Sequence, residues 1–182
     1  MLTIERLSGP FGAEITGLDL NTEPDTATFD EIVEELHRHA VICIRGQQSL
    51  TPEKHIAFSK RFGELEVHVQ SSFNLDGYPE IYCLPNCVDE KGDALGLAEA
   101  GRVWHTDLSY MREPSRCSLL HALEVPIDTD GNPLGDTLFA SCTMAHEALA
   151  DEMKERLRTM KAIHSYRQVY GRIKAKSKPG RQ

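Results

Sequence analysis

Two residues with metal-binding side chains stand two positions apart, in the segment Trp104-His105-Thr106-Asp107. On an extended strand, residues two apart project from the same face, because successive side chains alternate. An imidazole and a carboxylate on one face can supply two ligands of a 2-His-1-carboxylate triad, which leaves positions on iron(II) open for a cosubstrate and dioxygen. The same spacing also fits a hydrogen-bonded His–Asp pair near the surface, so the triplet alone leaves both interpretations open.

The other histidines have simpler explanations. His37 and His39 fall late in a predicted helix, where the helix dipole stabilises a positive charge. His121 and His164 could serve as a third metal ligand, but no pattern around them assigns that role. His121 lies in an apolar run, which favours a hydrogen-bonded residue of the core or of an interface.

The cysteines predict neither a disulfide framework nor a zinc site. Their number, five, is odd, and their spacing fits no known framework of disulfides. Cys83 and Cys87 are spaced like half of a zinc site, but no second close pair follows them. We therefore expect reduced and mostly buried thiols.

The elements that must position these residues are mainly strands. Alternating or short apolar runs between turn residues predict strands over residues 2–7, 12–20, 41–44, 65–69, 80–84, 102–106, 118–125 and 137–140. Helical spacing of apolar residues predicts helices over 28–40 and over 143–160, the second in one or two pieces. Thr51-Pro52 begins a further helix that ends at Gly63, because threonine caps a helix and proline suits its first position. The order lacks the regular strand–helix alternation of a doubly wound sheet and predicts a mixed fold dominated by strands.

The net charge of −8 is spread unevenly over the 182 residues. Residues 161–182 hold seven Lys or Arg and no acidic residue, so the body of the chain is strongly acidic. An acidic body repels nucleic acid and anionic lipid, and we expect neither as a partner. We find no apolar run that could span a membrane and no signal peptide at the start, so the expected location is the cytoplasm.

Four blocks of sequence together resemble one known family. They are Gly12-Ala13-Glu14-Ile15-Thr16-Gly17-Leu18-Asp19-Leu20, Phe58-Ser59-Lys60-Arg61-Phe62-Gly63-Glu64-Leu65, Trp104-His105-Thr106-Asp107 and Gly135-Asp136-Thr137-Leu138-Phe139. In their order and approximate spacing they are similar to the taurine/2,4-dichlorophenoxyacetate family of iron(II)- and 2-oxoglutarate-dependent dioxygenases. The resemblance predicts a partial domain of this kind over residues 1–166. Residues 167–182 would be a basic tail that belongs to the lid region of an intact family member.

The resemblance implies a fold and a set of site residues. The fold would be a double-stranded β-helix, the cupin-like jelly roll, with flanking helices and an incomplete C-terminal side. His105 and Asp107 would be the first two iron ligands, and Thr137 would hydrogen-bond the far carboxylate of 2-oxoglutarate. His68 would face an anionic group of the substrate, to which a histidine can donate a hydrogen bond. Thr137 could equally be an ordinary strand threonine, and His68 a solvent-facing strand residue.

Two positions depart from the pattern that is specific for taurine. Ser71 stands where a substrate-binding tyrosine is expected, and Gly101 stands where an asparagine is expected. We therefore expect a small anionic organic substrate other than taurine. Sulfonates, sulfate esters, aryloxy acids and other carboxylic acids all fit that description.

The family resemblance also implies a region beyond residue 182. That region would carry a distal iron-binding histidine, an arginine for 2-oxoglutarate and the strands that close the jelly roll. Without it, iron would have fewer protein ligands, and unpaired strand edges would favour aggregation or pairing with another chain, including a second copy. A truncated gene product, a partial sequence and a chain that needs a partner all fit this pattern.

The function implied by the resemblance is a dioxygenase reaction that uses iron(II), 2-oxoglutarate and dioxygen. The substrate would be hydroxylated while 2-oxoglutarate is converted to succinate and carbon dioxide. Two other functions remain open, namely a jelly-roll module that binds a small acid without turnover and a metal-dependent cupin hydrolase. A nucleic-acid binder that uses the basic tail is a more distant alternative.

Overall fold

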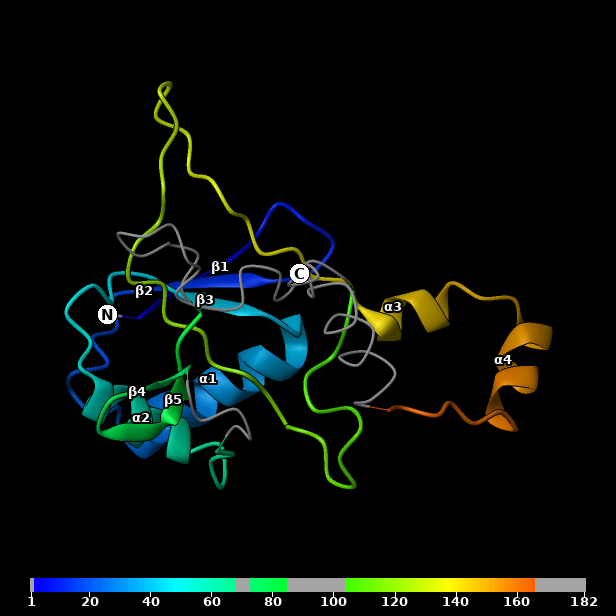
Figure 1. Cartoon of the computed structure of the whole chain (residues 1–182). Coiled ribbons are helices and arrows are strands. Elements are labelled where there is room, and N and C mark those ends of the chain that lie inside the picture. The colour runs from blue at the N-terminus through cyan, green and yellow to red at the C-terminus, as the bar shows by residue number, and fades with distance from the viewer. Residues whose placement is uncertain (1, 68–72, 85–103, 166–182) are drawn as a thin grey trace, which may run out of the picture.

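The computed structural model describes residues 2–67, 73–84 and 104–165 (Figure 1). Its elements, in chain order, are β1 (Thr3–Arg6), β2 (Ala13–Thr16), α1 (Thr26–His39), β3 (Ile42–Ile44), α2 (Pro52–Lys60), β4 (Asn74–Leu75), β5 (Tyr78–Tyr82), α3 (Cys142–Glu147) and α4 (Asp151–Arg158). None of the helices in these ranges is both long and apolar enough to cross a membrane.

The N-terminal part is a three-stranded sheet with the order β1-β2-β3. β1 runs antiparallel to β2, with Ile4 opposite Ile15, and β2 runs parallel to β3, with Ile15 opposite Ile44. Parallel neighbours need a crossover connection, and α1 supplies it here. Figure 1 shows α1 lying along one face of this sheet. The strands predicted over residues 2–7, 12–20 and 41–44 are thus confirmed, in shorter form.

The core lies between this sheet, α1 and α2. Its buried apolar residues are Ile15, Leu20, Phe29, Ile32, Leu50 and Phe58. Three aromatic rings meet edge to face at this core. The ring centroid of Phe29 lies 6.1 Å from that of Phe58 and 4.9 Å from that of Phe62. Edge-to-face packing brings the positive ring edge against the negative ring face and adds to the gain from burial.

Local signals in the sequence set the ends of both N-terminal helices. The side chain of Asp25 accepts a hydrogen bond from the backbone N of Thr28 at 2.8 Å, which caps α1 and lowers the pKa of that carboxyl. α1 ends where Ala40 adopts a left-handed conformation with φ of 62°. α2 begins after Thr51, whose hydroxyl accepts from the backbone N of Lys54 at 3.4 Å. The predicted start of α2 is therefore confirmed.

The side-chain amide of Gln47 is buried and binds three backbone groups. Its Nε2 donates to the carbonyl oxygens of Leu18 at 2.6 Å and Arg45 at 2.7 Å. Its Oε1 accepts from the backbone N of Leu20 at 3.0 Å. The amide thus joins the loop after β2 to the loop after β3. Each loop contributes one buried residue to the core, Leu20 from the first and Leu50 from the second.

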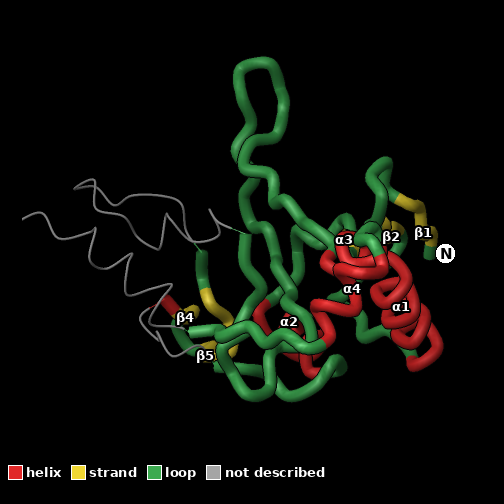
Figure 2. Tube along the Cα trace, turned by 90° about the vertical axis from the view of Figure 1, so that its right-hand side faces the viewer, coloured by secondary structure: helices red, strands yellow, loops and turns green. Residues whose placement is uncertain are grey.

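The later part of the described chain contains fewer regular elements than the sequence predicts. Residues 65–67, 104–106, 118–125 and 137–140 were expected in strands, but none of them forms a ladder. The strand predicted at 80–84 is confirmed as β5, which pairs with β4 in a two-stranded hairpin. Residues 126–134 form a finger that stands away from the body in Figures 1 and 2. The finger is closed by a single bridge between Ile127 and Pro133.

A strand is stable only when a neighbour satisfies its backbone groups, which explains this difference. The side chains of Leu120, Leu123 and Leu138 are 68%, 86% and 73% exposed, so neither a second sheet nor a helix covers them in the described residues. Helical residues outnumber strand residues in the described ranges, and the expected dominance of strands is not found there. The mixed class is confirmed, whereas the jelly roll stays a prediction.

The helical segment predicted near the end is confirmed as two pieces. α3 begins after Ser141, whose hydroxyl accepts from the backbone N of Met144 at 3.2 Å. α4 begins after Ala150, which has no side-chain cap. Figure 1 shows both helices to one side of the sheet. Neither helix contains a buried residue.

Replacement of the buried Gln47 tests its part in the fold. Gln47→Met keeps the length of the side chain but leaves the backbone N–H of Leu20 without its partner. We expect a loss of about 1–3 kcal/mol or more in the free energy of unfolding, since a buried donor then lacks a hydrogen bond. Urea unfolding followed by circular dichroism measures this change in the free energy of unfolding. The exposed neighbour offers a matched control, and Gln48→Met should stay within about 0.5 kcal/mol of the parent chain. Equal effects of the two substitutions would contradict the assignment.

Candidate metal centre

His105 and Asp107 lie side by side, as the sequence predicts. His105 Nε2 is 3.4 Å from Asp107 Oδ1, and the two side chains are 46% and 53% exposed. The segment that carries them has no strand ladder in its described residues, so the predicted strand over 102–106 is not found in 104–106. The two side chains nevertheless share one side of the backbone, and both can be reached from solvent.

The backbone reverses directly after Asp107. Leu108 has φ of 49°, a left-handed conformation that is uncommon for a residue with a Cβ. The backbone N of Met111 donates to the carbonyl oxygen of Leu108 at 2.9 Å and closes the turn. Asp107 therefore stands at the entrance of a tight turn, where its backbone lacks the support of a sheet.

A serine holds the second oxygen of the Asp107 carboxylate. Ser118 Oγ donates to Asp107 Oδ2 at 2.6 Å, while Oδ1 faces His105. Ser118 is not among the site residues that the sequence predicts, because a residue eleven positions from Asp107 has no periodic relation to it. Only the folding of the turn back onto the following segment brings the two side chains together.

The segment that carries Ser118 is attached to the N-terminal part of the fold. Cys117, Leu119 and His121 are partly buried and alternate with the exposed Ser118 and Leu120, as in an extended chain with one covered side. Leu119 packs against the core cluster. His121 thus has the interface role that its apolar surroundings favoured.

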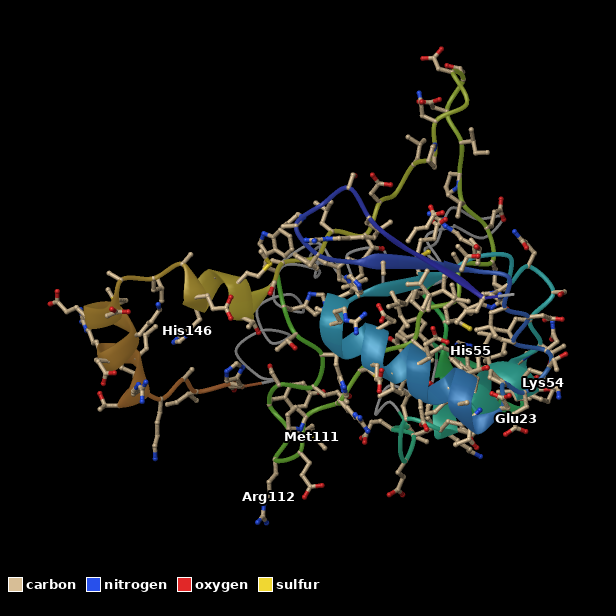
Figure 3. The ribbon with its side chains drawn as sticks, turned by 180° about the vertical axis from the view of Figure 1, so that it is seen from behind. Glu23, Lys54, His55, Met111, Arg112 and His146 are labelled. Atoms are coloured by element: carbon tan, nitrogen blue, oxygen red, sulfur yellow. The ribbon has the colours of Figure 1, made fainter. Side chains whose placement is uncertain are left out.

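His121 makes two contacts with the N-terminal part. Its Nε2 lies 3.0 Å from the backbone carbonyl oxygen of Gln47. Its ring lies 5.8 Å from that of His55 on α2, edge to face. Figure 3 shows His55 within the body of the molecule, whereas His146 lies apart from it on α3. The Asp107 carboxylate is therefore connected, through Ser118 and His121, to the loop that Gln47 organises.

Of the other predicted site residues, only Thr137 lies in the described ranges, and it is not in the hydrogen-bonded group of His105, Asp107 and Ser118. Thr137 is exposed in an irregular stretch after Gly135. His68 lies outside the described residues, as do Ser71 and Gly101. Over residues 2–67, 73–84 and 104–165, no group of three His, Cys, Asp or Glu side chains could hold a metal ion. In this part of the chain the predicted ligands His105 and Asp107 therefore lie together without a third.

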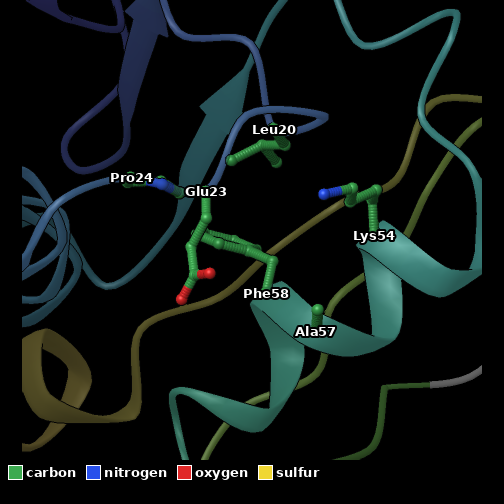
Figure 4. A pocket seen from close by; sticks show the side chains of 6 residues that line it. All are labelled: Leu20, Glu23, Pro24, Lys54, Ala57 and Phe58. Carbon is green, nitrogen blue, oxygen red and sulfur yellow. The ribbon is translucent and has the colours of Figure 1, made fainter.

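Two cavities contain none of the predicted site residues, one within the N-terminal part and the other between that part and the start of α3. The smaller, of about 30 Å³, lies between α2 and the loop before α1, with Glu23, Lys54 and Phe58 among its lining residues (Figure 4). This volume has room for little more than a water molecule.

The larger cavity, of about 340 Å³, is bordered by Arg6, Arg38 and His39. Arg6 donates to the carbonyl oxygen of Pro10 at 2.8 Å. Glu35 binds both Arg38, at 2.5 Å, and His39, at 3.1 Å. The two guanidinium groups that border this cavity, those of Arg6 and Arg38, are therefore held by partners inside the protein.

Comparison with known proteins identifies the family. The family model described as "Taurine catabolism dioxygenase TauD, TfdA family" matches residues 3–182. The chain belongs to this family, and the resemblance seen in the sequence is confirmed. The match continues past residue 166, while the boundary predicted there stays untested.

Curated relatives match nearly the whole chain. It is 31% identical to pentalenolactone F synthase of Streptomyces avermitilis over 171 residues, which are 93% of this chain and 55% of that protein. It is 32% identical to an alkylsulfatase of Acinetobacter baylyi over 178 residues, 98% of this chain and 51% of that protein. It is 27% identical to an alpha-ketoglutarate-dependent sulfate ester dioxygenase of Pseudomonas putida over 180 residues, 99% of this chain and 55% of that protein. The chain spans about half the length of these relatives.

Solved structures show the same relation at the level of the fold. A taurine dioxygenase from Burkholderia xenovorans matches with a TM-score of 0.62 and 24% identity, over 87% of this chain and 51% of that one. The protein AAD-2, solved in complex with Mn(II) and N-oxalylglycine, matches with a TM-score of 0.60 and 19% identity, over 95% of this chain and 56% of that one. At these identities the likeness concerns the fold alone.

The contact between His55 and His121 predicts a loss of stability in mild acid. Burial, and secondarily His121, lowers the pKa of His55 below its ordinary value of 6.5. The folded state therefore binds a proton at His55 less readily than the unfolded state. The contribution of His55 to the free energy of unfolding is thus fully present above pH 6.5 and is lost as the pH drops below it. Thermal unfolding between about pH 7.5 and about pH 5 measures the fall.

His55→Gln should flatten this decrease, because the glutamine does not titrate. His37→Gln replaces an exposed histidine of α1 and serves as the matched control. A parent chain and a His55→Gln variant with the same pH dependence would show that the pair does not control acid stability.

Proposed function

We propose that the protein of which this chain forms at least a part is an iron(II)- and 2-oxoglutarate-dependent dioxygenase acting on a small anionic organic substrate. The observation that carries the proposal is the adjacency of His105 and Asp107, 3.4 Å apart, within a chain that belongs to the TauD, TfdA family. Both side chains are partly exposed, so a metal ion and a cosubstrate can reach them.

The two donor groups, an imidazole and a carboxylate, are of the kinds that bind iron(II). One imidazole nitrogen and one carboxylate oxygen are two of the three ligands of a facial triad, which leaves open positions on the metal. His105 and Asp107 would hold the ion, and a third protein ligand would come from outside the described residues. With 2-oxoglutarate and dioxygen, bound iron(II) supplies the oxidising power to hydroxylate a substrate C–H bond, with succinate and carbon dioxide as co-products.

The other assigned residues would bind and orient the organic molecules. The hydroxyl of Thr137 would donate a hydrogen bond to the far carboxylate of 2-oxoglutarate. That carboxylate would also need a cationic partner, because a hydroxyl does not balance its negative charge. His68 would donate to the anionic group of the substrate. Related proteins include a sulfate ester dioxygenase, an alkylsulfatase and a phenoxypropionate dioxygenase. These relatives support sulfate esters and aryloxy acids as the first substrates to examine.

A second function is favoured by the incomplete ligand set. With two metal ligands in its described residues, this chain could bind a small acid without catalysing a reaction. A metal-dependent hydrolase is the other alternative. The three functions differ in their requirement for His105, for 2-oxoglutarate and for oxygen, so a single set of measurements separates them.

The first test is an anaerobic titration of the purified 182-residue chain with iron(II) and 2-oxoglutarate. We expect a saturable visible charge-transfer band in the parent chain and its loss in His105→Ala and Asp107→Ala, because each removes a metal ligand. His146→Ala, at an exposed histidine of α3, should leave the band unchanged. A folded parent chain without a band, or an equal band in His105→Ala, would contradict the assigned metal site.

Turnover is tested under air by mass spectrometry of succinate, with sulfonates, sulfate esters and aryloxy acids offered in parallel. The proposal expects succinate that depends on substrate and iron, and no product without 2-oxoglutarate. Product formed without 2-oxoglutarate and oxygen would favour the hydrolase. Binding of the acids that persists in His105→Ala, without succinate, would favour the non-catalytic module.

A further inference from the structure

Both oxygens of the Asp107 carboxylate have a neighbouring side chain. Oδ1 faces His105 Nε2 at 3.4 Å, and Oδ2 accepts a hydrogen bond from Ser118 Oγ at 2.6 Å. A carboxylate on an exposed turn, 53% accessible, could otherwise rotate about its side-chain bonds. The serine hydroxyl opposes that rotation, because rotation would break a short hydrogen bond to a charged acceptor.

We propose that Ser118 is a positioning residue that fixes the orientation of the Asp107 carboxylate and keeps Oδ1 beside His105. The inference deepens the proposed function and rests on it where metal binding is concerned. A partner on the second oxygen of a carboxylate ligand leaves the first oxygen pointing at the metal. Loss of such an outer partner commonly costs about 10–100-fold in metal affinity.

Ser118 can do this because its own position is fixed. Its neighbour Leu119 packs against the core, and His121 lies 3.0 Å from the carbonyl oxygen of Gln47. The serine therefore projects from a segment that is attached to the N-terminal part at two points. The turn that carries Asp107 has no sheet to support it in its described residues, so the hydrogen bond transfers the rigidity of the attached segment to the ligand.

A serine that only stabilises the surface turn would behave differently. Its removal would change the unfolding midpoint but leave the affinity for a metal ion the same. A positioning serine changes metal affinity, and a hydroxyl placed there by another residue restores it. These two readouts separate the roles.

The experiment measures Mn(II) binding to the full chain, from the loss of the electron paramagnetic resonance signal of the free ion. Carboxylate ligands suit Mn(II), which can be handled in air without the oxidation that iron(II) undergoes. We expect Ser118→Ala to weaken binding by about 10–100-fold. Ser118→Thr, which retains a hydroxyl, should bind within a few-fold of the parent chain. Ser115→Ala, at an exposed serine three residues away, is the matched control and should bind like the parent chain.

A double-mutant cycle in the metal-free chain tests the same hydrogen bond without any metal. The shift in urea midpoint caused by Ser118→Ala should shrink in an Asp107→Ala background, because the partner is already absent. Equal Mn(II) affinity for Ser118→Ala and the parent chain would overturn the inference. If the parent chain binds no Mn(II), the proposed metal site fails and the positioning role fails with it, whereas additive effects of the two substitutions would overturn the Ser118–Asp107 hydrogen bond itself.

Discussion

The side chain of Gln47 is the point on which the arrangement of this chain depends. Its buried amide binds the backbone of Leu18, Leu20 and Arg45, and its backbone carbonyl oxygen lies 3.0 Å from His121. One residue thereby joins the loops on either side of the parallel strand pair to a segment far along the chain. A buried amide is favourable only while all its polar atoms have partners, so the loops and the later segment constrain one another.

This connection helps to hold the candidate metal centre in place. His105 and Asp107 lie outside any strand ladder of the described chain, and both are about half exposed. Ser118 holds the Asp107 carboxylate, and the segment that carries Ser118 is held by the core and by the Gln47 loop. Asp107, a predicted metal ligand, is thus connected to the N-terminal sheet and helices, which themselves carry none of the predicted ligands.

The family relation agrees with the sparse strand pairing in the later described residues. The chain spans about half the length of its curated relatives, and its described residues contain two predicted metal ligands without a third and many exposed apolar side chains after residue 117. Strand propensity alone did not produce strands over 118–125 or 137–140, because a strand needs a neighbour for its backbone groups. Alternating burial over residues 117–121 indicates extended chain in the first part of the strand predicted over 118–125, but pairing depends on a partner strand, and the described residues contain none for this segment.

By itself, the sequence determined features that depend on near neighbours. The caps at Asp25 and Thr51 set the starts of two helices, and the spacing of His105 and Asp107 placed both side chains on one side of the backbone. Short-range rules suffice there, because the interacting groups lie within a turn of each other. Tertiary structure alone decided that Ser118 holds Asp107 and that His121 reaches Gln47, 74 positions away. No periodicity links such residues, since only the packing of the core brings them together.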